Sequence, residues 1–102
     1  MPGDPALVNG RDLDQVIREI VAEVLVIPAD QVAPGTALIR DLGAESIDFL
    51  DLVFRLEEAL GTRIPYTRWQ LFLETRLAGA ELSAAITPEV VRGFAEQEMG
   101  RA

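Results

Sequence analysis

The 102-residue sequence contains no cysteine and no histidine, and all nine of its basic residues are arginine. The absence of cysteine excludes disulfides, a thiolate nucleophile and cysteine-ligated zinc. The absence of histidine removes the usual general base and metal ligand, and the absence of lysine excludes Schiff-base catalysis. Any thiol or imidazole chemistry must therefore come from an attached group or from another protein.

An excess of acidic residues sets the charge of the molecule, because 17 aspartates and glutamates give a net charge of −8 at pH 7. Such a chain repels nucleic-acid phosphates and anionic membrane surfaces and attracts basic protein surfaces. We therefore expect basic protein partners and no nucleic-acid partner. The longest strongly apolar run near the start, residues 24–27, is much shorter than the roughly 20 residues that span a bilayer, so we expect no membrane insertion. No secretory signal pattern is present, which predicts a cytoplasmic protein.

The length and the 49% content of hydrophobic residues suit a single domain with one core. Residues 1–11 contain two prolines and two glycines and show no apolar periodicity. We therefore expect a flexible lead-in that adds little to the core. The domain itself is predicted over residues 12–102, and we expect it to be a monomer.

Apolar residues at helical spacing predict a first helix over residues 12–26. Its apolar face contains Leu13, Val16, Ile17, Ile20, Val21 and Val24. Asp12 followed by Gln15 resembles a capping box at the start, and Pro28 prevents the helix from continuing. Residues 27–45 contain too many prolines and glycines for a regular element, so they predict a long ordered loop.

A second helix is predicted over residues 46–60, with Gly61 as a left-handed cap at its end. A third, less regular helix follows, and Thr67 with Gln70 offers a capping box near its start. Its apolar residues are Trp69, Phe72, Leu73 and Leu77. Residues 80–86 are small and apolar and fit either a loop or an extra helical turn.

The last helix is predicted over residues 88–99, because Thr87 offers an N-cap directly before Pro88 at the first helical position. No persuasive strand pattern occurs anywhere in the chain. The sequence therefore predicts an all-α fold, a small bundle with one long loop between its first two helices.

The second predicted helix carries two apolar stripes instead of one. The face that a bundle would bury contains Phe49, Leu52, Val53, Leu56 and Leu60. A second set, Ile47, Leu50 and Phe54, projects on the side that also carries carboxylates. This set either packs against the loop or the third segment, or it forms an exposed docking strip, and the helical wheel leaves both interpretations open.

Much of the acidic excess is concentrated near this helix, in Asp41, Glu45, Asp48, Asp51, Glu57 and Glu58. One interpretation is an ordinary solvated helix face, and the other is a docking surface for a basic partner. Ser46 lies where an N-cap residue belongs. Because position 49 is phenylalanine, the reciprocal capping box for Ser46 is absent.

Residues 41–58, DLGAESIDFLDLVFRLEE, closely resemble the central signature of the acyl carrier protein family. In that family a Leu-Gly-Ala loop leads into an Asp-Ser-Leu triplet, an acidic second helix and an Ile-Pro corner. The corresponding motifs here are Leu42-Gly43-Ala44, Glu45-Ser46-Ile47 and Ile64-Pro65, in the same order. The resemblance covers residues 12–65 and 87–99, and it is looser over the first and the last predicted helix. Several motifs in one order are more specific than an isolated triplet, and they imply a four-helix acyl-carrier bundle.

The resemblance implies that Ser46 carries 4′-phosphopantetheine, donated from coenzyme A by a phosphopantetheinyl transferase, with Glu45 and Ile47 on either side. The chain would then be a carrier and not an enzyme. It would hold acyl intermediates as thioesters and present them to partners of fatty acid, lipid or polyketide synthesis, such as an acyl-ACP synthetase, a ketosynthase or an acyltransferase with basic docking surfaces. The partner surface implied comprises Asp41, Ile47, Asp48, Leu50, Asp51, Phe54, Glu57 and Glu58. A phosphate at the first turn of a helix suits the helix dipole.

Departures from the family pattern predict a specialised carrier. Glu45 and Ile47 replace the usual Asp and Leu beside the serine, and Arg55 places a base in the docking helix. Residues 66–86 are longer than the usual third-helix region. Their aromatic residues either enlarge an acyl pocket or close the core, and apolar helical stripes favour the core.

Two other function classes compete with the carrier. A hydrolase using paired carboxylates is disfavoured, because these acids lie on one local segment with no second wall around a substrate. An unmodified acidic helical adaptor would bind a basic protein through the helix at 46–60, with Ser46 acting only as a cap. The adaptor predicts no prosthetic group.

Overall fold

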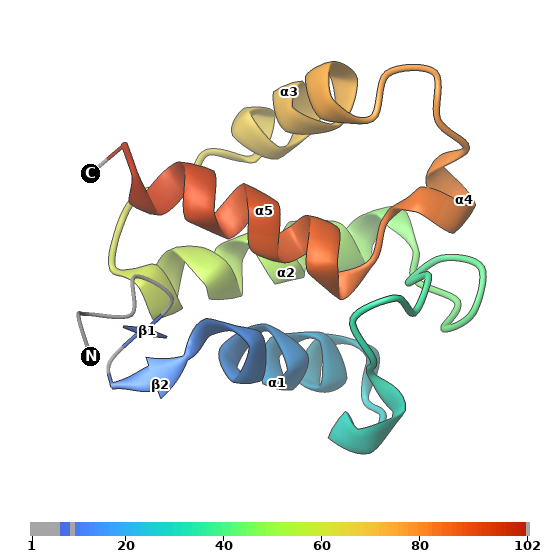
Figure 1. Ribbon diagram of the computed structural model, residues 1–102, viewed down its shortest axis with the longest axis horizontal. Coiled ribbons are helices and arrows are strands. Elements are labelled where there is room, and N and C mark those ends of the chain that lie inside the picture. Colours follow the sequence, from blue (N-terminus) through green and yellow to red (C-terminus); the bar gives the residue numbers. More distant parts are fainter. Residues whose placement is uncertain (1–6, 9, 102) are drawn as a thin grey trace.

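The computed structural model describes residues 7–8 and 10–101 and consists mainly of helices (Figure 1). The longer helices are α1 Leu13–Leu25, α2 Ser46–Leu60, α3 Tyr66–Arg76 and α5 Pro88–Met99. A short helix, α4 Leu82–Ala85, precedes α5, and a 3₁₀ turn, η1 Ala29–Gln31, lies in the loop between α1 and α2. The helical bundle and its long first loop are thus confirmed, and residues 80–86 contain the extra turn.

A small hairpin precedes the helices, since β1 Leu7–Val8 pairs antiparallel with β2 Arg11–Asp12. The expectation that residues 1–11 add little to the core is wrong for Val8, which is buried among core residues. Two-residue strands are too short to show an alternating pattern, so the sequence did not predict them. The part of that expectation that concerns residues 1–6 and 9 lies outside the described residues.

Local hydrogen bonds explain where α1 begins and ends. The Asp12 carboxylate accepts the N–H of Asp14 at 2.9 Å, which confirms Asp12 as the N-cap. The prediction that Gln15 completes the capping box is wrong, because its side chain donates to Glu19 at 2.8 Å instead. The helix ends at Leu25, and its C-cap is Val26, whose φ of 56° lies in the left-handed region.

The other helix ends follow from single residues. Gly61 closes α2 with a φ of 68°, as expected, and the Thr87 hydroxyl accepts the Val90 N–H at 3.2 Å to cap α5. The capping box expected from Thr67 and Gln70 is wrong. The cap of α3 is Pro65, so Thr67 already lies inside the first helical turn.

An aromatic cluster joins α3 to the rest of the bundle. α1 packs against α2 and α5, and α3 packs on α2 (Figure 1). The Trp69 ring is buried at the centre of the cluster, with ring centroids 5.9 Å from Phe49, 5.9 Å from Phe72 and 5.1 Å from Phe94. Two aromatic residues of the lengthened third region, Trp69 and Phe72, therefore close the core.

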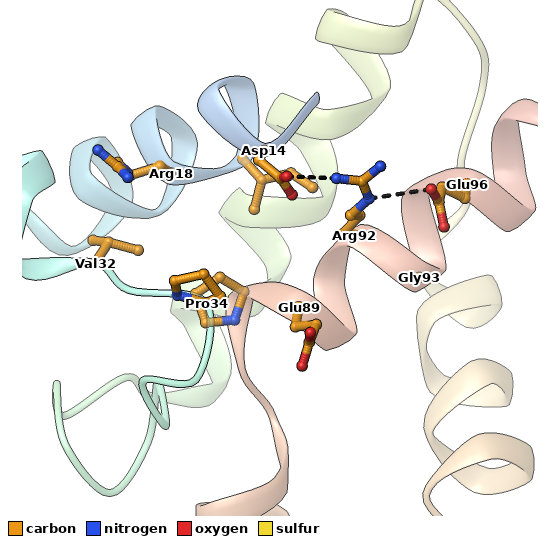
Figure 2. Close-up of a pocket in the computed structure, with 10 residues that line it drawn as sticks. Asp14, Arg18, Val32, Pro34, Glu89, Arg92, Gly93 and Glu96 are labelled. Carbon is orange, nitrogen blue, oxygen red and sulfur yellow. Dashed lines mark hydrogen bonds and ion pairs between the residues drawn. The ribbon is translucent and has the colours of Figure 1, made fainter. Parts of the chain in front are cut away.

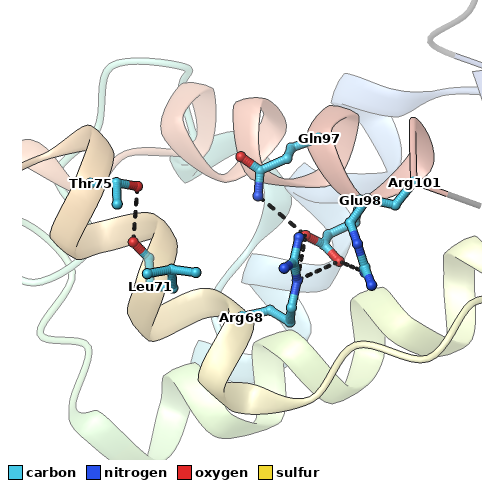
Figure 3. Close-up of polar contacts among 6 residues, drawn as sticks. All are labelled: Arg68, Leu71, Thr75, Gln97, Glu98 and Arg101. Carbon is cyan, nitrogen blue, oxygen red and sulfur yellow. Dashed lines mark hydrogen bonds and ion pairs between the residues drawn. The ribbon is translucent and has the colours of Figure 1, made fainter.

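A buried carboxylate ties the start of α3 to the end of α5 (Figure 3). Glu98 is fully buried and accepts from Arg68 at 2.9 Å, from Arg101 at 2.7 Å and from the Gln97 amide at 3.2 Å. Burial alone raises the pKa of Glu98, but hydrogen bonds from Arg68, Gln97 and Arg101 outweigh it and leave the pKa below its ordinary value. The ionised carboxylate is therefore the form that fits this site.

Crossing a bilayer takes a long and apolar helix, and residues 7–8 and 10–101 contain none that meets both conditions.

Candidate functional site

Ser46 is the first residue of α2, and its side chain is exposed. The sequence placed Ser46 at the N-cap, but in the structure the N-cap is Glu45. The Glu45 N–H donates to the Asp48 carboxylate at 2.8 Å, which supplies the reciprocal bond that Phe49 does not offer to Ser46. The hydroxyl of Ser46 is thus released from capping, and it makes no hydrogen bond to any described residue.

The turn before Ser46 is held by Asp41. Its carboxylate accepts the Ala37 N–H at 3.0 Å and the Arg40 Nε at 3.0 Å. The hydrogen bonds from Arg40 and then from the Ala37 N–H hold the pKa of Asp41 below its ordinary value. Ala44 N–H also donates to the Leu38 carbonyl at 2.9 Å. These contacts hold the backbone that leads into α2.

The same turn is joined to the lengthened region before α5. The Leu38 N–H donates to the Ile86 carbonyl at 2.9 Å, and the Arg40 N–H donates to the Ser83 carbonyl at 3.0 Å. The segment around α4 therefore lies beside the start of α2 (Figure 1). Residues 82–86, which belong to the lengthened region, therefore lie close to the turn that leads into Ser46.

An open hollow of about 430 Å³ lies beside Ser46 between α2, α3 and α4. Its lining is mainly apolar and consists of Ile39, Ala44, Glu45, Ser46, Phe49, Tyr66, Trp69, Leu73, Leu82 and Ile86. Partial burial raises the pKa of the Tyr66 phenol, so it stays neutral at pH 7. The lengthened third region thus closes the core through Trp69 and Phe72, and it also forms part of the wall of this hollow. Leu82 and Ile86 were missed as site residues because short apolar runs do not reveal which cavity they line.

The second apolar set of α2 is exposed. The exposed fractions are 67% for Ile47, 51% for Leu50 and 55% for Phe54. These values exclude the packing interpretation that the helical wheel left open. Three unburied apolar side chains on one helix, bordered by carboxylates, form a surface of the kind that binds other proteins.

The neighbouring acids are less free than the sequence suggested. Asp51 accepts from Arg55 at 3.1 Å, and Glu57 accepts the Ile64 N–H at 2.8 Å. Asp41 and Asp48 accept the bonds described above, whereas Glu58 accepts none from described residues. Most of these carboxylates therefore hold the local fold while they also keep their charge at the surface.

A second hollow, of about 440 Å³, lies between α1, α5 and the loop that contains Pro34 (Figure 2). Arg92 crosses it and pairs with Asp14 at 2.5 Å and with Glu96 at 3.1 Å. This second hollow shares no lining residue with the hollow beside Ser46. Within the described part of the chain, no cluster of three or more acidic residues is placed to hold a metal ion.

The sequence was compared with protein families and with known proteins. The family described as "Phosphopantetheine attachment site" matches residues 15–68. Acyl carrier protein AcpXL of Brucella melitensis biotype 1 is 42% identical over 53 residues, which are 52% of this chain and 57% of that protein. The acyl carrier protein of Helicobacter pylori is 43% identical over 49 residues, 48% of this chain and 63% of that protein.

A third relative, acyl carrier protein AcpXL of Rhizobium meliloti, is 38% identical over 53 residues, 52% of this chain and 56% of that protein. The chain thus spans somewhat more than half the length of the curated relatives that it matches. The matched residues run from α1 to the start of α3 and include Ser46. Because the family match covers more than half of the chain, this protein belongs to the acyl carrier protein family, whose domain is the phosphopantetheine attachment site.

Proposed function

We propose that this protein is an acyl carrier whose Ser46 hydroxyl accepts 4′-phosphopantetheine from coenzyme A. The observation that carries the proposal is an exposed serine at the first position of α2 whose hydroxyl is left free by the Glu45–Asp48 cap. In the attachment, the Ser46 Oγ–phosphorus bond forms as the pyrophosphate P–O bond of coenzyme A breaks, and adenosine 3′,5′-bisphosphate leaves with the electron pair of that bond. The hydroxyl proton leaves to a base of the transferase, because this chain offers no histidine to take it.

The start of α2 suits an anionic phosphodiester. The first N–H groups of a helix have no partner within the helix, and the helix dipole places partial positive charge there. The carboxylates of Glu45 and Asp48 lie close to this position, but the Asp48 carboxylate already accepts a hydrogen bond from the Glu45 N–H. When bound, the group supplies a thiol that holds acyl chains as thioesters, a function that a chain without cysteine cannot perform alone.

The hollow beside Ser46 supports a role in shielding apolar cargo. Its walls from α2, α3 and α4 carry Phe49, Leu73, Leu82 and Ile86. Each methylene removed from water there is stabilised by about 0.8 kcal/mol. The neutral phenol of Tyr66 adds a polar group to an otherwise mainly apolar lining.

The exposed surface of α2 supports the proposed partner interactions. Ile47, Leu50 and Phe54 offer the apolar contact, and the surrounding carboxylates, including Asp48 and Glu58, offer attraction for basic enzymes. The proposed partners are a phosphopantetheinyl transferase and acyl-handling enzymes such as an acyl-ACP synthetase, a ketosynthase or an acyltransferase. Members of this family are carriers and not catalysts. We propose the same for this chain, as a monomer in the cytoplasm.

The competing proposal is an unmodified adaptor that binds a basic protein through α2. The exposure of Ile47 fits both functions, so the modification itself must decide between them. The test is the intact mass after incubation with coenzyme A and a broad-specificity phosphopantetheinyl transferase. The wild type should gain one phosphopantetheine group, and Ser46→Ala should gain none.

Ser83 provides a matched control, because it is the only other serine in the chain. It is half-buried, and its hydroxyl donates to Glu81 at 3.0 Å. Ser83→Ala should therefore be modified like the wild type. No gain with several transferases would favour the adaptor, and a gain that persists in Ser46→Ala would place the attachment elsewhere.

A further inference from the structure

At the end of α1, the side chain of Val26 is exposed to solvent, and its backbone has a conformation that is unfavourable for valine. Val26 is 88% exposed, more than any other large apolar side chain in the described chain. Its φ of 56° and ψ of 53° lie in the left-handed region, which is unfavourable for a β-branched residue and open to glycine. Neither burial nor backbone preference therefore accounts for valine at this position. Residues held in such conformations cluster at functional sites.

Val26 borders a shallow, open hollow of about 610 Å³ that joins α1 to the outer face of α2. The hollow is lined by Ala22, Glu23, Val26, Ile27, Pro28 and Arg55. Its walls are thus mainly aliphatic, with one ion pair across them. Arg55 comes from α2, one residue after the exposed Phe54, so the hollow continues the proposed docking surface toward α1.

Carboxylates hold the Arg55 guanidinium by its edges. Its Nε donates to Asp51 at 3.1 Å, and its Nη1 donates to Glu23 on α1 at 3.0 Å. Bonds of this kind lie in the plane of the guanidinium, so they fix its orientation and leave its faces for other contacts. Arginine stacks favourably on aromatic rings through such a face.

The charges around the hollow indicate which side chain fits it. An incoming cation would find Glu23 and Asp51 already paired with Arg55. An incoming carboxylate would meet the acidic surface of a chain with a net charge of −8. An uncharged side chain meets neither competition with Arg55 nor charge repulsion. Among uncharged side chains, an aromatic ring can both contact the aliphatic side chain of Val26 and stack on the guanidinium.

We propose that a partner protein docks an aromatic side chain into the hollow formed by Val26 and Arg55. The proposal rests on the carrier function proposed above, because it takes the occupant to be an enzyme bound along α2. It adds a contact on α1 that the exposed strip of Ile47, Leu50 and Phe54 does not include. It also gives a role to Arg55, the one base in the docking helix, as a specificity-determining residue.

The test uses small probes and the full chain labelled with ¹⁵N. N-acetyltryptophanamide should shift the backbone amide of Val26 and the Nε–H resonance of Arg55 in a saturable manner. N-acetylleucinamide and N-acetylargininamide serve as aliphatic and cationic probes, and they should shift these resonances little at the same concentrations. Larger shifts with the arginine probe, or equal shifts with the leucine probe, would overturn the aromatic assignment. The absence of shifts with all three probes would overturn the site.

Two variants separate binding from folding. Val26→Gly should unfold at an unchanged or higher urea concentration, because glycine accepts the left-handed backbone, yet it should lose the response to the tryptophan probe. Arg55→Lys keeps the charge but not the planar group, and it should weaken probe binding about two- to fivefold, the range for an exposed cation–π contact. Leu71→Ala removes another exposed apolar residue, on α3, and should leave probe binding unchanged. A clear loss of stability in Val26→Gly would contradict the strain on which the proposal rests.

The intact-mass assay with coenzyme A and transferase is run on the same samples. If Ser46 is never modified, the carrier function fails whatever the probe does. If Ser46 is modified in the wild type and the probe still leaves Val26 and Arg55 unshifted, only the aromatic site fails. The two failures therefore give different results.

Discussion

Replacing Glu98 with glutamine tests the ion cluster that holds α3 against α5. Glu98 is fully buried, whereas Arg68 has 29% and Arg101 has 47% of its side chain exposed. The variant keeps the shape of the side chain but removes the charge that both guanidinium groups contact. Hydrogen bonds to charged groups contribute about 1.5–3 kcal/mol each, but Arg101 can turn to solvent and its contribution is screened. We therefore expect Glu98→Gln to lower the free energy of unfolding by about 2 kcal/mol.

The assay is urea unfolding followed by circular dichroism. With a slope of about 1–2 kcal/mol per molar urea, the midpoint should fall by about 1–2 M. Glu96→Gln is the matched control on the same helix. Glu96 is half exposed and pairs with Arg92 one turn away, so its loss should cost less than about 0.5 kcal/mol. Equal losses of unfolding free energy in Glu98→Gln and Glu96→Gln would refute the reasoning, because the burial of Glu98 would then add nothing to the stability of its ion pairs.

The pH dependence adds a second check on Glu98. Its folded-state pKa lies below its ordinary value, so folding favours the ionised form. The stabilisation should be complete above the unfolded pKa of about 4.3, and it should be lost as the pH falls through the folded pKa. The difference in stability between wild type and Glu98→Gln should shrink over that acidic range. A difference that stayed constant there would mean that ionisation of Glu98 does not stabilise the fold.

Three further predictions address the helix ends and the docking charge. Gly61→Ala should destabilise the protein by about 1 kcal/mol, because alanine resists the φ of 68°, whereas Gly35→Ala, at a position without positive φ, should not; equal unfolding midpoints for the two would contradict this. Thr87→Ala removes the N-cap of α5 and should cost about 1 kcal/mol in urea unfolding. Thr62 lies between α2 and α3, and its hydroxyl makes no hydrogen bond to a described residue, so Thr62→Ala is a control that should leave the midpoint unchanged. The rate of modification by a transferase should fall as salt rises from about 0.05 to 0.5 M, since the acidic surface of α2 attracts the enzyme; a rate independent of salt would show that charge does not guide docking.

The order of the long helices was predictable from the sequence, because apolar periodicity and helix-breaking residues mark them locally. Gly61 and Thr87 mark helix ends through backbone preferences that act within a few residues. The motif around Ser46 is likewise contiguous, so it pointed to the site without any knowledge of the fold. Local chemistry and the structure agree at Gly61 and Thr87.

Features that depend on distant residues were not predictable. Glu98 is buried and pairs with Arg68, which lies 30 residues earlier on α3, so the environment of Glu98 depends on how α3 and α5 pack. Burial of Val8 depends on a two-residue strand pair and on packing against the core. One local feature was missed as well. Glutamate is not among the preferred N-cap residues, so the sequence did not indicate that Glu45, with Asp48 three residues later, caps α2. The wall that Leu82 and Ile86 form beside Ser46 depends on the backbone bonds that join residues 38 and 40 to residues 86 and 83.

The central claim is that Ser46 carries 4′-phosphopantetheine, and the most direct measurement is tandem mass spectrometry of the protein purified from the cells that make it. Trypsin cleaves after Arg40 and Arg55, which releases residues 41–55, a peptide in which Ser46 is the only hydroxyl-bearing side chain. We predict that this peptide carries phosphopantetheine, free or acylated, and that the modification is lost in Ser46→Ala. An unmodified peptide 41–55 throughout the purified protein, or a phosphopantetheine group on any other peptide, would contradict the account.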